Sequence, residues 1–428
     1  MRNERFSVMK KMIGIVLFWI FLAEGLWGCG NPGAVGKGGE TKPVSESGLH
    51  GLDTPGETET AGEEVGQDSG RADSFPTEAE TVGEEEEEQI LEEVQAAALT
   101  YQDLYAAAEK GEALNAVIDA ESLHAMADRM AQAGYSVTCD DNDRNMANWE
   151  SLDAALSKAK EGETVSAVFY SLASYGGFHC YQMAFSHGEM LLTTAEMDWS
   201  EEGEPYLSYL ERICVYSWEY TEKGWLIWEK EPSQNMEMDR HTLTRVKPLE
   251  ETARMLCETY IEPVGYAMTN LFLTDWSADD PGDLALNDTF GILYFYQYGQ
   301  NPPYEDQVPA QEWEAVMTRF LPFSVETLRQ NSVYEPQRDS YAWKSWGYGS
   351  GMALPSLPFP EVVSWEKADD QIWVLEVEGV SKEEGMDCAF AHEVTLQIHE
   401  DGSAVYLSNR LIPEKKNSVP RYRIRSGG

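Results

Sequence analysis

Basic residues and closely spaced cysteines are scarce in this sequence. Lysine and arginine number 31 against 75 aspartate and glutamate residues, which gives a formal net charge of −44. A field of this sign repels phosphate backbones and anionic lipid head groups, so nucleic acid is excluded as a partner. We also find no internal repeat.

The chain has six cysteines and no C-x-x-C spacing, which excludes zinc-ribbon and thioredoxin-type sites. Apart from Cys29, an odd number remains, so disulfides cannot pair them all within one monomer. Most of them lie in apolar runs, and we interpret them as small buried hydrophobic residues. Their pairing stays open: Cys139, Cys180, Cys214, Cys257 and Cys388.

The N-terminus determines the expected compartment. Basic residues precede an apolar run over Met12–Ala23. This run is too short to span about 30 Å of hydrocarbon, but it has the length of a signal-peptide core. The segment Leu26-Trp-Gly-Cys29 follows, and it resembles the lipobox of bacterial lipoproteins.

The lipobox resemblance implies that residues 1–28 are a signal peptide removed before Cys29. In that family the cysteine thiol carries diacylglycerol, with fatty acyl chains such as palmitate. The expected location is the extracytoplasmic face of the cell membrane, with the N-terminal lipid as the membrane contact. The alternative is an uncleaved signal anchor, which also leaves the rest of the chain outside the cytoplasm.

Residues 29–88 form an acidic linker that is rich in Gly, Glu, Thr, Ser and Pro. Such a segment cannot bury enough apolar surface to offset its chain entropy, so we expect it to be disordered. As a flexible coil it would span roughly 40–45 Å. The linker would therefore hold a folded domain away from the membrane.

The folded part is predicted to be α+β. Residues 89–162 read as helical, with apolar residues at three- and four-residue steps from Ile90 to Leu104 and further helices at Ala120–Ala133 and Trp149–Lys160. Residues 163–247 change to a period of two, which predicts an antiparallel β-meander with a hairpin turn at Glu222-Lys-Gly224. The expected strands are Val165–Ser171, Phe178–Ser186, Glu189–Asp198, Ile213–Thr221 and Trp225–Lys230.

Residues 248–428 are predicted to form a C-terminal α+β domain, with helices packed on an antiparallel sheet. The expected helices are Leu249–Glu262, Asn287–Tyr298 and Pro309–Leu321, the last with its proline in the first turn. The expected strands are Val362–Lys367, Ile372–Val380, Ala389–Ile398 and Ala404–Leu411. The basic tail from Arg410 to Arg425 is interpreted as a solvated end, and the alternatives are pairing with the acidic domain or contact with anionic wall polymer.

A family resemblance covers most of residues 90–412. The segments Asn270–Trp276, Asp279-Asp280 and Phe290–Tyr298, with the closing Glu400–Asn409, resemble a family of uncharacterised lipoproteins from anaerobic Gram-positive bacteria. The family is a domain of unknown function. The resemblance therefore implies location and architecture but no activity and no catalytic residues.

One segment resembles a calcium-binding loop. Asp141, Asp143 and Asn145 have the spacing of the first three ligands. The loop also needs glycine at its sixth position and glutamate at its twelfth, where this chain has Met146 and Leu152. A polar turn before the next helix is the better interpretation.

Two further motifs fail on spacing. His392-Glu393 lacks the second histidine of a zinc protease, since Leu396 stands there, and His399 would point to the opposite face of a strand. The glycine-rich stretch 347–351 lacks the glycines of a serine elbow or a dinucleotide loop. We expect no metal and no cofactor.

An acidic loop is the candidate for chemistry. Asp275, Asp279 and Asp280 crowd around Trp276, and two carboxylates beside an aromatic ring could serve a glycosidase. Spacing within a loop does not fix the separation of two carboxyl groups. The alternative is a solvated loop with helix caps.

An aromatic stripe is the candidate for binding. Tyr216, Trp218 and Tyr220 alternate along one strand, and Trp225 and Trp228 lie on the partner strand. Exposed rings of this kind could stack on sugar rings. The alternative is that they fill the core of the meander.

The function most consistent with these patterns is a non-enzymatic, membrane-tethered binding or interaction protein. A cell-wall component or another protein is the expected partner. One alternative is a cell-surface glycan hydrolase that uses the carboxylates of the acidic loop, and another is a purely structural envelope factor. The oligomeric state stays open.

Overall fold

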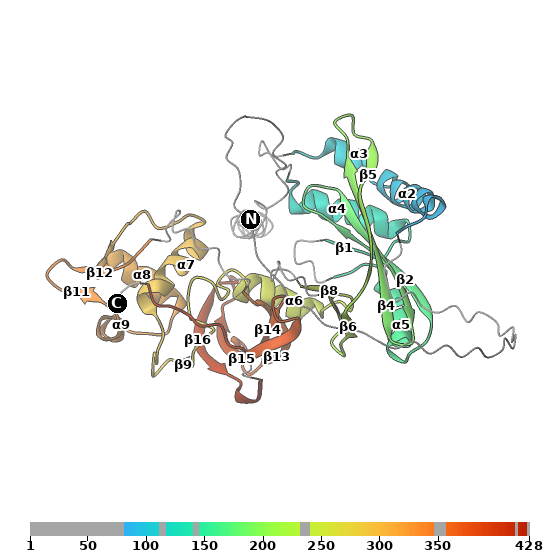
Figure 1. The fold of residues 1–428 in the computed structure, drawn as a ribbon. Coiled ribbons are helices and arrows are strands. Elements are labelled where there is room, and N and C mark those ends of the chain that lie inside the picture. The colour runs from blue at the N-terminus through green and yellow to red at the C-terminus, as the bar shows by residue number, and fades with distance from the viewer. Residues whose placement is uncertain are drawn as a thin grey trace, which may run out of the picture.

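A computed structural model describes residues 81–110, 117–139, 145–231, 240–345, 357–415 and 418–425. The predicted signal peptide, Cys29, Asp141, Asp143 and the glycine-rich stretch 347–351 lie outside the described residues. Helices and largely antiparallel sheets make up the fold, so the α+β class is confirmed (Figure 1). The N-terminal half contains helices α2 (Glu84–Leu99), α3 (Gln102–Ala107), α4 (Ala120–Gln132) and α5 (Trp149–Lys160), and strands β1 (Val137–Cys139), β2 (Val165–Leu172), β3 (Phe178–Ser186), β4 (Glu189–Trp199), β5 (Pro205–Cys214), β6 (Ser217–Tyr220), β7 (Trp225–Glu229) and β8 (His241–Arg245).

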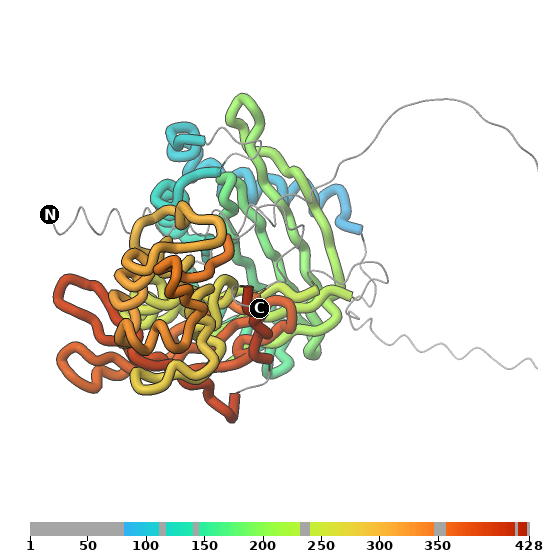
Figure 2. The backbone as a smooth tube through the Cα atoms, turned by 90° about the vertical axis from the view of Figure 1, so that its left-hand side faces the viewer, coloured from blue at the N-terminus to red at the C-terminus, as the bar shows by residue number. Residues whose placement is uncertain are grey.

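The first sheet has the order β1-β2-β3-β4-β5, with β1 parallel to β2 and all other pairs antiparallel. Its long strands β3–β5 run side by side in Figure 2. Side chains alternate between the two faces of a sheet. On one face Tyr170, Cys180 and Ala195 are cross-strand neighbours and share a core with α2 and α4. Helices α2 and α4 therefore fold around the same core as this face of the sheet.

The described residues cover the opposite face of the first sheet only in part. Phe169, Met183 and Leu192 on this face pack against Leu156 of α5 and Trp228 of β7. Figure 1 places α5 and β6 at one end of the long strands and α3 at the other end. The part of the face beyond Trp228 holds the groove described in the next section.

A small sheet of order β6-β7-β8 bridges the two halves of the molecule. Leu226 and Trp228 point to the core shared with the first sheet. Trp225 and Ile227 alternate with them and pack with Val380 of the C-terminal sheet. The strict alternation along β7 thus makes one strand bury both of its faces.

The C-terminal half contains a sheet of order β13-β14-β15-β16-β9 and a small sheet of order β10-β12-β11. Its core includes Trp313 and Tyr341, whose rings stack with centroids 3.9 Å apart. Its helical elements are α6 (Glu251–Leu256) with a π-helical turn (Cys257–Ile261), α7 (Leu286–Tyr298), α8 (Ala310–Phe320), α9 (Val325–Asn331) and a 3-10 turn (Pro413–Lys415). Its strands are β9 (Trp276–Ser277), β10 (Gln307–Pro309), β11 (Tyr334–Glu335), β12 (Ser340–Ala342), β13 (Phe359–Lys367), β14 (Ile372–Ser381), β15 (Met386–Ile398) and β16 (Ala404–Leu411).

Buried ion pairs fasten the bridging sheet to the C-terminal sheet. Glu361 and Glu378 are cross-strand neighbours on β13 and β14, and their side chains are 0% and 2% exposed. Arg245 of β8 donates to Glu361 at 2.7 Å. Lys223 and Lys415 both donate to Glu378. Two adjacent buried carboxylates require such cations, because burial of an unpaired charge is very costly.

The largest error of the sequence prediction concerns the strand expected at Ile213–Thr221. The chain changes sheets inside this segment: the Val215 N–H still donates to Met190 of β4, whereas the Tyr216 N–H donates to Glu229 of β7. An unbroken alternation of apolar and polar residues does not reveal a strand that passes from one sheet to another. The predicted meander is therefore two sheets, and β5 and β8 were missed.

Other boundaries differ by less. Helix α2 begins at Glu84, so the glutamate run at the end of the predicted linker is helical, and acidic side chains in a first turn suit the positive end of the helix dipole. The long helix expected after Ile90 is divided into α2 and α3. Pro309 is the N-cap of α8 rather than a residue of its first turn. The strand Ala404–Leu411 and the hairpin at Glu222–Gly224 are confirmed.

The basic tail is docked, so its interpretation as a solvated end was wrong and pairing with the acidic domain is confirmed. The Tyr422 hydroxyl and the Arg425 backbone N–H both donate to Oδ2 of Asp288, at 2.9 and 2.7 Å. Asp288 is 1% exposed, at the start of α7. A buried carboxylate thus satisfies its acceptors with the tail.

The five cysteines outside the signal region are thiols in the structure. Cys139, Cys180 and Cys257 are buried, as expected for small hydrophobic residues. Burial raises the pKa of the Cys180 thiol to about 12, and the hydrogen bond from Tyr170 lowers it only in part. A thiol of this kind is a packing group rather than a nucleophile.

Candidate functional site

The aromatic stripe divides between core and surface. Tyr220, Trp225 and Trp228 are at most 4% exposed, so the core interpretation is confirmed for these three. Trp218 is half-buried on Phe185, and its indole N–H donates to the carbonyl of Gly188 at 2.9 Å. Tyr216 is 62% exposed and immediately precedes β6.

The acidic loop lies in the C-terminal half, and its side chains mostly serve the backbone. Trp276 is 5% exposed, and its indole N–H donates to the carbonyl of Leu271. Asp275 Oδ1 accepts the backbone N–H of Leu411 at 2.6 Å. Asp279 is exposed in the turn after β9. Because Trp276 and Trp218 belong to different sheets and cores, the two sets of candidate residues form two separate places on the molecule.

His392 lies in the C-terminal core rather than in a metal site. It is fully buried, with Nδ1 2.7 Å from Oδ1 of Asn409 and Nε2 3.0 Å from the Tyr266 hydroxyl. A neutral ring that donates to Asn409 and accepts from Tyr266 satisfies all three groups. Burial lowers the pKa of His392 to about 3. Among the described residues, no three His, Cys, Asp or Glu side chains gather as a metal site.

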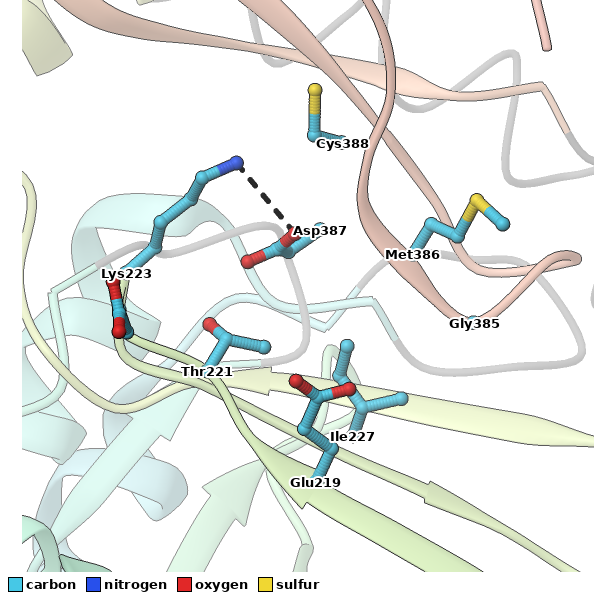
Figure 3. Close-up of a pocket in the computed structure, with 9 residues that line it drawn as sticks. Glu219, Thr221, Lys223, Ile227, Gly385, Met386, Asp387 and Cys388 are labelled. Atoms are coloured by element: carbon cyan, nitrogen blue, oxygen red, sulfur yellow. Dashed lines mark ion pairs between the residues drawn. The ribbon is translucent and has the colours of Figure 1, made fainter. Parts of the chain in front are cut away.

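A pocket of about 350 Å³ lies where the bridging sheet meets the C-terminal sheet, and we call it the junction pocket. Figure 3 shows Lys223 reaching toward Asp387, with a distance of 3.6 Å between ammonium and carboxylate. Lys223 also donates to the buried Glu378, and Cys388 stands nearby. Burial raises the pKa of the Cys388 thiol to about 11. The polar groups of this pocket hold two sheets together, and its lysine is already neutralised by two carboxylates. The lining residues are Glu219, Thr221, Glu222, Lys223, Ile227, Gly385, Met386, Asp387 and Cys388.

A second pocket, of about 200 Å³, lies on the uncovered part of the first sheet, and we call it the sheet groove. It combines aromatic rings with carboxylates, which is typical of sites for small polar ligands. Strands β3, β4 and β5 form its floor, and β7 and β8 contribute its side. The lining residues are His179, Tyr181, Leu192, Thr194, Glu196, Tyr209, Glu211, Trp228, Lys230 and Thr242.

The aromatic part of the groove is well ordered by ring contacts. The Tyr181 ring lies edge-on to Trp228, with centroids 5.5 Å apart, and stacks with His179 at 6.0 Å. Trp228 is 1% exposed and anchors this cluster in the core, whereas Tyr209 is 47% exposed at the rim. Nδ1 of His179 is covered and has no hydrogen-bond partner among the described residues.

The carboxylates give the groove a negative potential. Oε1 of Glu196 accepts the hydroxyl of Tyr175 at 2.7 Å. Lys230 lies 3.5 Å from Oε2 of Glu211. Burial raises the pKa of the Tyr209 phenol, and the hydrogen bond with Glu211 and the charges of Glu211 and Glu196 raise it further. The charges around this phenol therefore favour its protonated form, and they also favour a cation at this place.

The end of the groove is fixed by the turn between β2 and β3. The carbonyl of Gly176 accepts both the Tyr101 hydroxyl at 2.9 Å and the Trp199 indole N–H at 2.8 Å. Gly176 has φ of +85°, and a Cβ there would lie 2.6 Å from the side chain of Ile118. This turn places the Tyr175 hydroxyl against Glu196. Because the turn is held by contacts on the helix-covered face, those contacts orient a carboxylate on the opposite face of the sheet.

Sequence analysis did not find the sheet groove. Its carboxylates, Glu196 and Glu211, lie on β4 and on the missed strand β5. Only the register, which pairs Thr194 with Glu211 and Glu196 with Tyr209, shows that they share a face. The signal available in the sequence was the alternation of polar and aromatic residues along each strand, which identifies a face but not its neighbours.

A family model described as a family of unknown function (DUF6070) matches residues 87–425. The chain belongs to DUF6070. The match covers both halves of the fold, including the sheet groove, the junction pocket and the docked tail. A search of the curated proteins finds no match for this DUF6070 chain. Helices in the described part of the chain are all too short or too polar to cross a membrane.

The residues on which the family resemblance was based have structural roles in this DUF6070 chain. Asn270 accepts the backbone N–H of Ala285 at 2.8 Å and donates to the carbonyl of Asp283 at 2.8 Å. Asn270 therefore holds the backbone just before α7 begins. In the same loop, the Trp276 indole N–H donates to the carbonyl of Leu271. These contacts explain the motif by packing and hydrogen bonding, without a catalytic step.

Proposed function

We propose that this DUF6070 chain is a non-enzymatic binding protein, tethered by a lipid on Cys29 to the extracytoplasmic face of the cell membrane. The sheet groove is the observation that carries the binding proposal. It combines aromatic walls with a few convergent polar groups in a concave site, as ligand sites do. The tether is supported by the lipobox resemblance and by the acidic linker that follows it.

Binding is favoured over glycan hydrolysis by the roles of the acidic loop. A glycosidase needs two carboxyl groups about 5–10 Å apart on either side of one substrate bond. Asp275 is bound to the backbone of β16, and Oδ1 of Asp280 accepts the N–H of Gly282 at 3.0 Å. These carboxylates stabilise the turn around β9.

The first prediction concerns the tether. A Cys29→Ala variant is expected to shift from the membrane fraction to the soluble fraction, because a lipid-anchored chain loses its acyl chains with the thiol. Immunoblots of fractionated cells measure the shift. The matched control is Cys388→Ala, which removes a half-buried thiol far along the chain and should leave the distribution unchanged. Equal membrane retention of the Cys29→Ala variant and the parent would contradict the lipid anchor.

The second prediction concerns the groove. With purified Gram-positive cell walls as the probe, the full mature chain is expected to co-sediment, and Tyr209→Ala is expected to weaken this binding by about tenfold. The matched control is Glu121→Gln on α4, which covers the opposite face of the sheet. Equal sedimentation of the parent and the Tyr209→Ala variant would remove the groove as the binding site. Release of soluble sugar from the walls by the parent would show a hydrolase instead.

A further inference from the structure

The geometry of the sheet groove points to an alkylammonium group as the chemical group that it recognises. This inference rests on the proposed binding function and adds the ligand class to it. It follows from four features: the placement of two carboxylates, the aromatic surfaces beside them, the size of the groove, and a lysine of the chain that already contacts one carboxylate.

The two carboxylates lie on one face of adjacent strands. Glu196 pairs with Tyr209 and Thr194 pairs with Glu211, so Glu196 and Glu211 are diagonal neighbours across β4 and β5. Diagonal neighbours in an antiparallel pair have backbones about 7–8 Å apart. Carboxylates on side chains of this length can approach one cation from two sides. An ammonium group donates three hydrogen bonds and accepts none, which suits two acceptor groups.

The aromatic surfaces suit the stem and the charge of the same group. Trp228, at 1% exposure, lies beneath the groove with Tyr181 edge-on to it, and Tyr209, 47% exposed at the rim, presents the accessible ring. Aromatic faces attract cations, and the attraction strengthens as water is excluded. The methylene stem of an alkylammonium also packs on such rings.

The size of the groove limits what enters it. Its volume of about 200 Å³ lies below the roughly 300–1,000 Å³ of pockets for drug-sized molecules. The groove therefore accepts a group of the size of one side chain, such as the end of a lysine or of a polyamine. The net charge of −44 on the chain also draws cations to its surface.

Lys230 shows how an ammonium sits at this place. Its Nζ lies 3.5 Å from Glu211, and the two side chains are 53% and 36% exposed. An ion pair between side chains this exposed is weak, because water and salt screen the two charges. An incoming ammonium can therefore displace Lys230, and Lys230 acts as an internal competitor for Glu211.

If Lys230 competes for Glu211, removing its charge should increase the affinity of the groove for an ammonium ligand. Equilibrium dialysis of the full mature chain, at about 150 mM salt, would use labelled Nα-acetyl-lysine methylamide as the monovalent probe. Lys230→Gln is expected to bind the probe about threefold more tightly than the parent, whereas Glu211→Gln is expected to bind it about tenfold more weakly. At this ionic strength a remote charge is largely screened, since the Debye length is about 8 Å. Lys158→Gln on α5 makes the same charge change as Lys230→Gln and should leave the affinity unchanged.

Two further probes distinguish the source of the ammonium group and the outcomes that would contradict the inference. Spermidine tests a free polyamine against the lysine-like probe, and a tighter parent affinity for one of them identifies the source. Binding of a neutral N-acetylglucosamine trisaccharide, lost in Tyr209→Ala and unaffected by Lys230→Gln, would overturn the ammonium assignment and keep the binding function. If neither cationic nor neutral probes respond to the groove variants, the inference and the proposed binding site both fail.

Discussion

Replacing Glu361 with glutamine is expected to lower the free energy of unfolding by about 3–5 kcal/mol. The Arg245 guanidinium lies 2.7 Å from Oε2 of Glu361, and the two side chains are 8% and 0% exposed. Without the carboxylate, the buried Arg245 keeps its hydrogen bond to the Lys247 carbonyl but loses the opposite charge of Glu361. The Trp225 indole N–H, 3.2 Å from the same oxygen, loses its charged acceptor as well. Chemical denaturation of the parent and the variant measures the difference.

The paired replacement Arg245→Leu with Glu361→Leu distinguishes two explanations of this loss. Either the buried charge of Arg245 is costly once its counter-charge is removed, or the ion pair itself is strongly stabilising. Exchange of a whole buried pair for apolar residues is often neutral or stabilising, so the double variant is expected to be more stable than Glu361→Gln alone. The surface control is Asp103→Asn, which breaks a pair with Arg129 at 3.3 Å between side chains that are 68% and 42% exposed. It should cost at most about 1 kcal/mol. A Glu361→Gln variant as stable as this control would contradict the structure at the junction of the two sheets.

His392 is expected to make the protein lose stability as the pH falls below about 6.5. Its pKa is lowered to about 3 in the folded chain by burial, whereas an unfolded histidine has a pKa of about 6.5. Between these two pH values His392 is protonated in the unfolded chain but neutral in the folded chain, so acid favours unfolding. The contribution is present above pH 6.5 and is lost as the pH falls toward 3. From pH 6.5 to 4.5 the free energy of unfolding should decrease by about 2 kcal/mol from this residue alone.

Comparison with a His392→Gln variant isolates this contribution, because other titrating groups act equally in both proteins. The variant can still donate to Asn409 and accept from Tyr266, and its stability should depend less steeply on pH by about 1 kcal/mol per unit on average between pH 6.5 and 4.5. The matched control is His124→Gln, which makes the same replacement at an exposed position on α4. Parallel pH profiles for His392→Gln and the parent would contradict the neutral, buried state of His392.

The fold class was predictable from the sequence, whereas the buried ion pairs between the two sheets and the sheet groove were not. Amphipathic periods of 3.6 and 2 predicted most helices and strands, because each element must bury one face. Glu361 and Glu378 stand inside strands that read as ordinary, and nothing local indicates that Arg245, Lys223 and Lys415 neutralise them. Their partners come from distant parts of the chain, so only the folded arrangement reveals which buried charges are paired.

The aromatic stripe illustrates the same division. Its alternation predicted a strand pair and a hairpin at Glu222–Gly224, and both exist. Whether a ring lies in the core or at the surface depends on which sheet covers that face. Trp228 is buried because the bridging sheet packs on the first sheet, whereas Tyr216 is exposed where the chain passes between them.

The sequence by itself determined the acidic character of the chain, its α+β class, the failure of the metal and nucleotide motifs, and the expected export signal at Cys29. These properties depend on composition and on residues close together along the chain, where spacing is directly visible. The tertiary structure alone decided that β5 completes the first sheet, that a three-stranded sheet joins the two halves, and that Glu196 and Glu211 face one groove with Tyr181 and Trp228. Strand register and sheet order are set by packing between distant segments, and a sequence pattern specifies which residues share a face without specifying what lies opposite them.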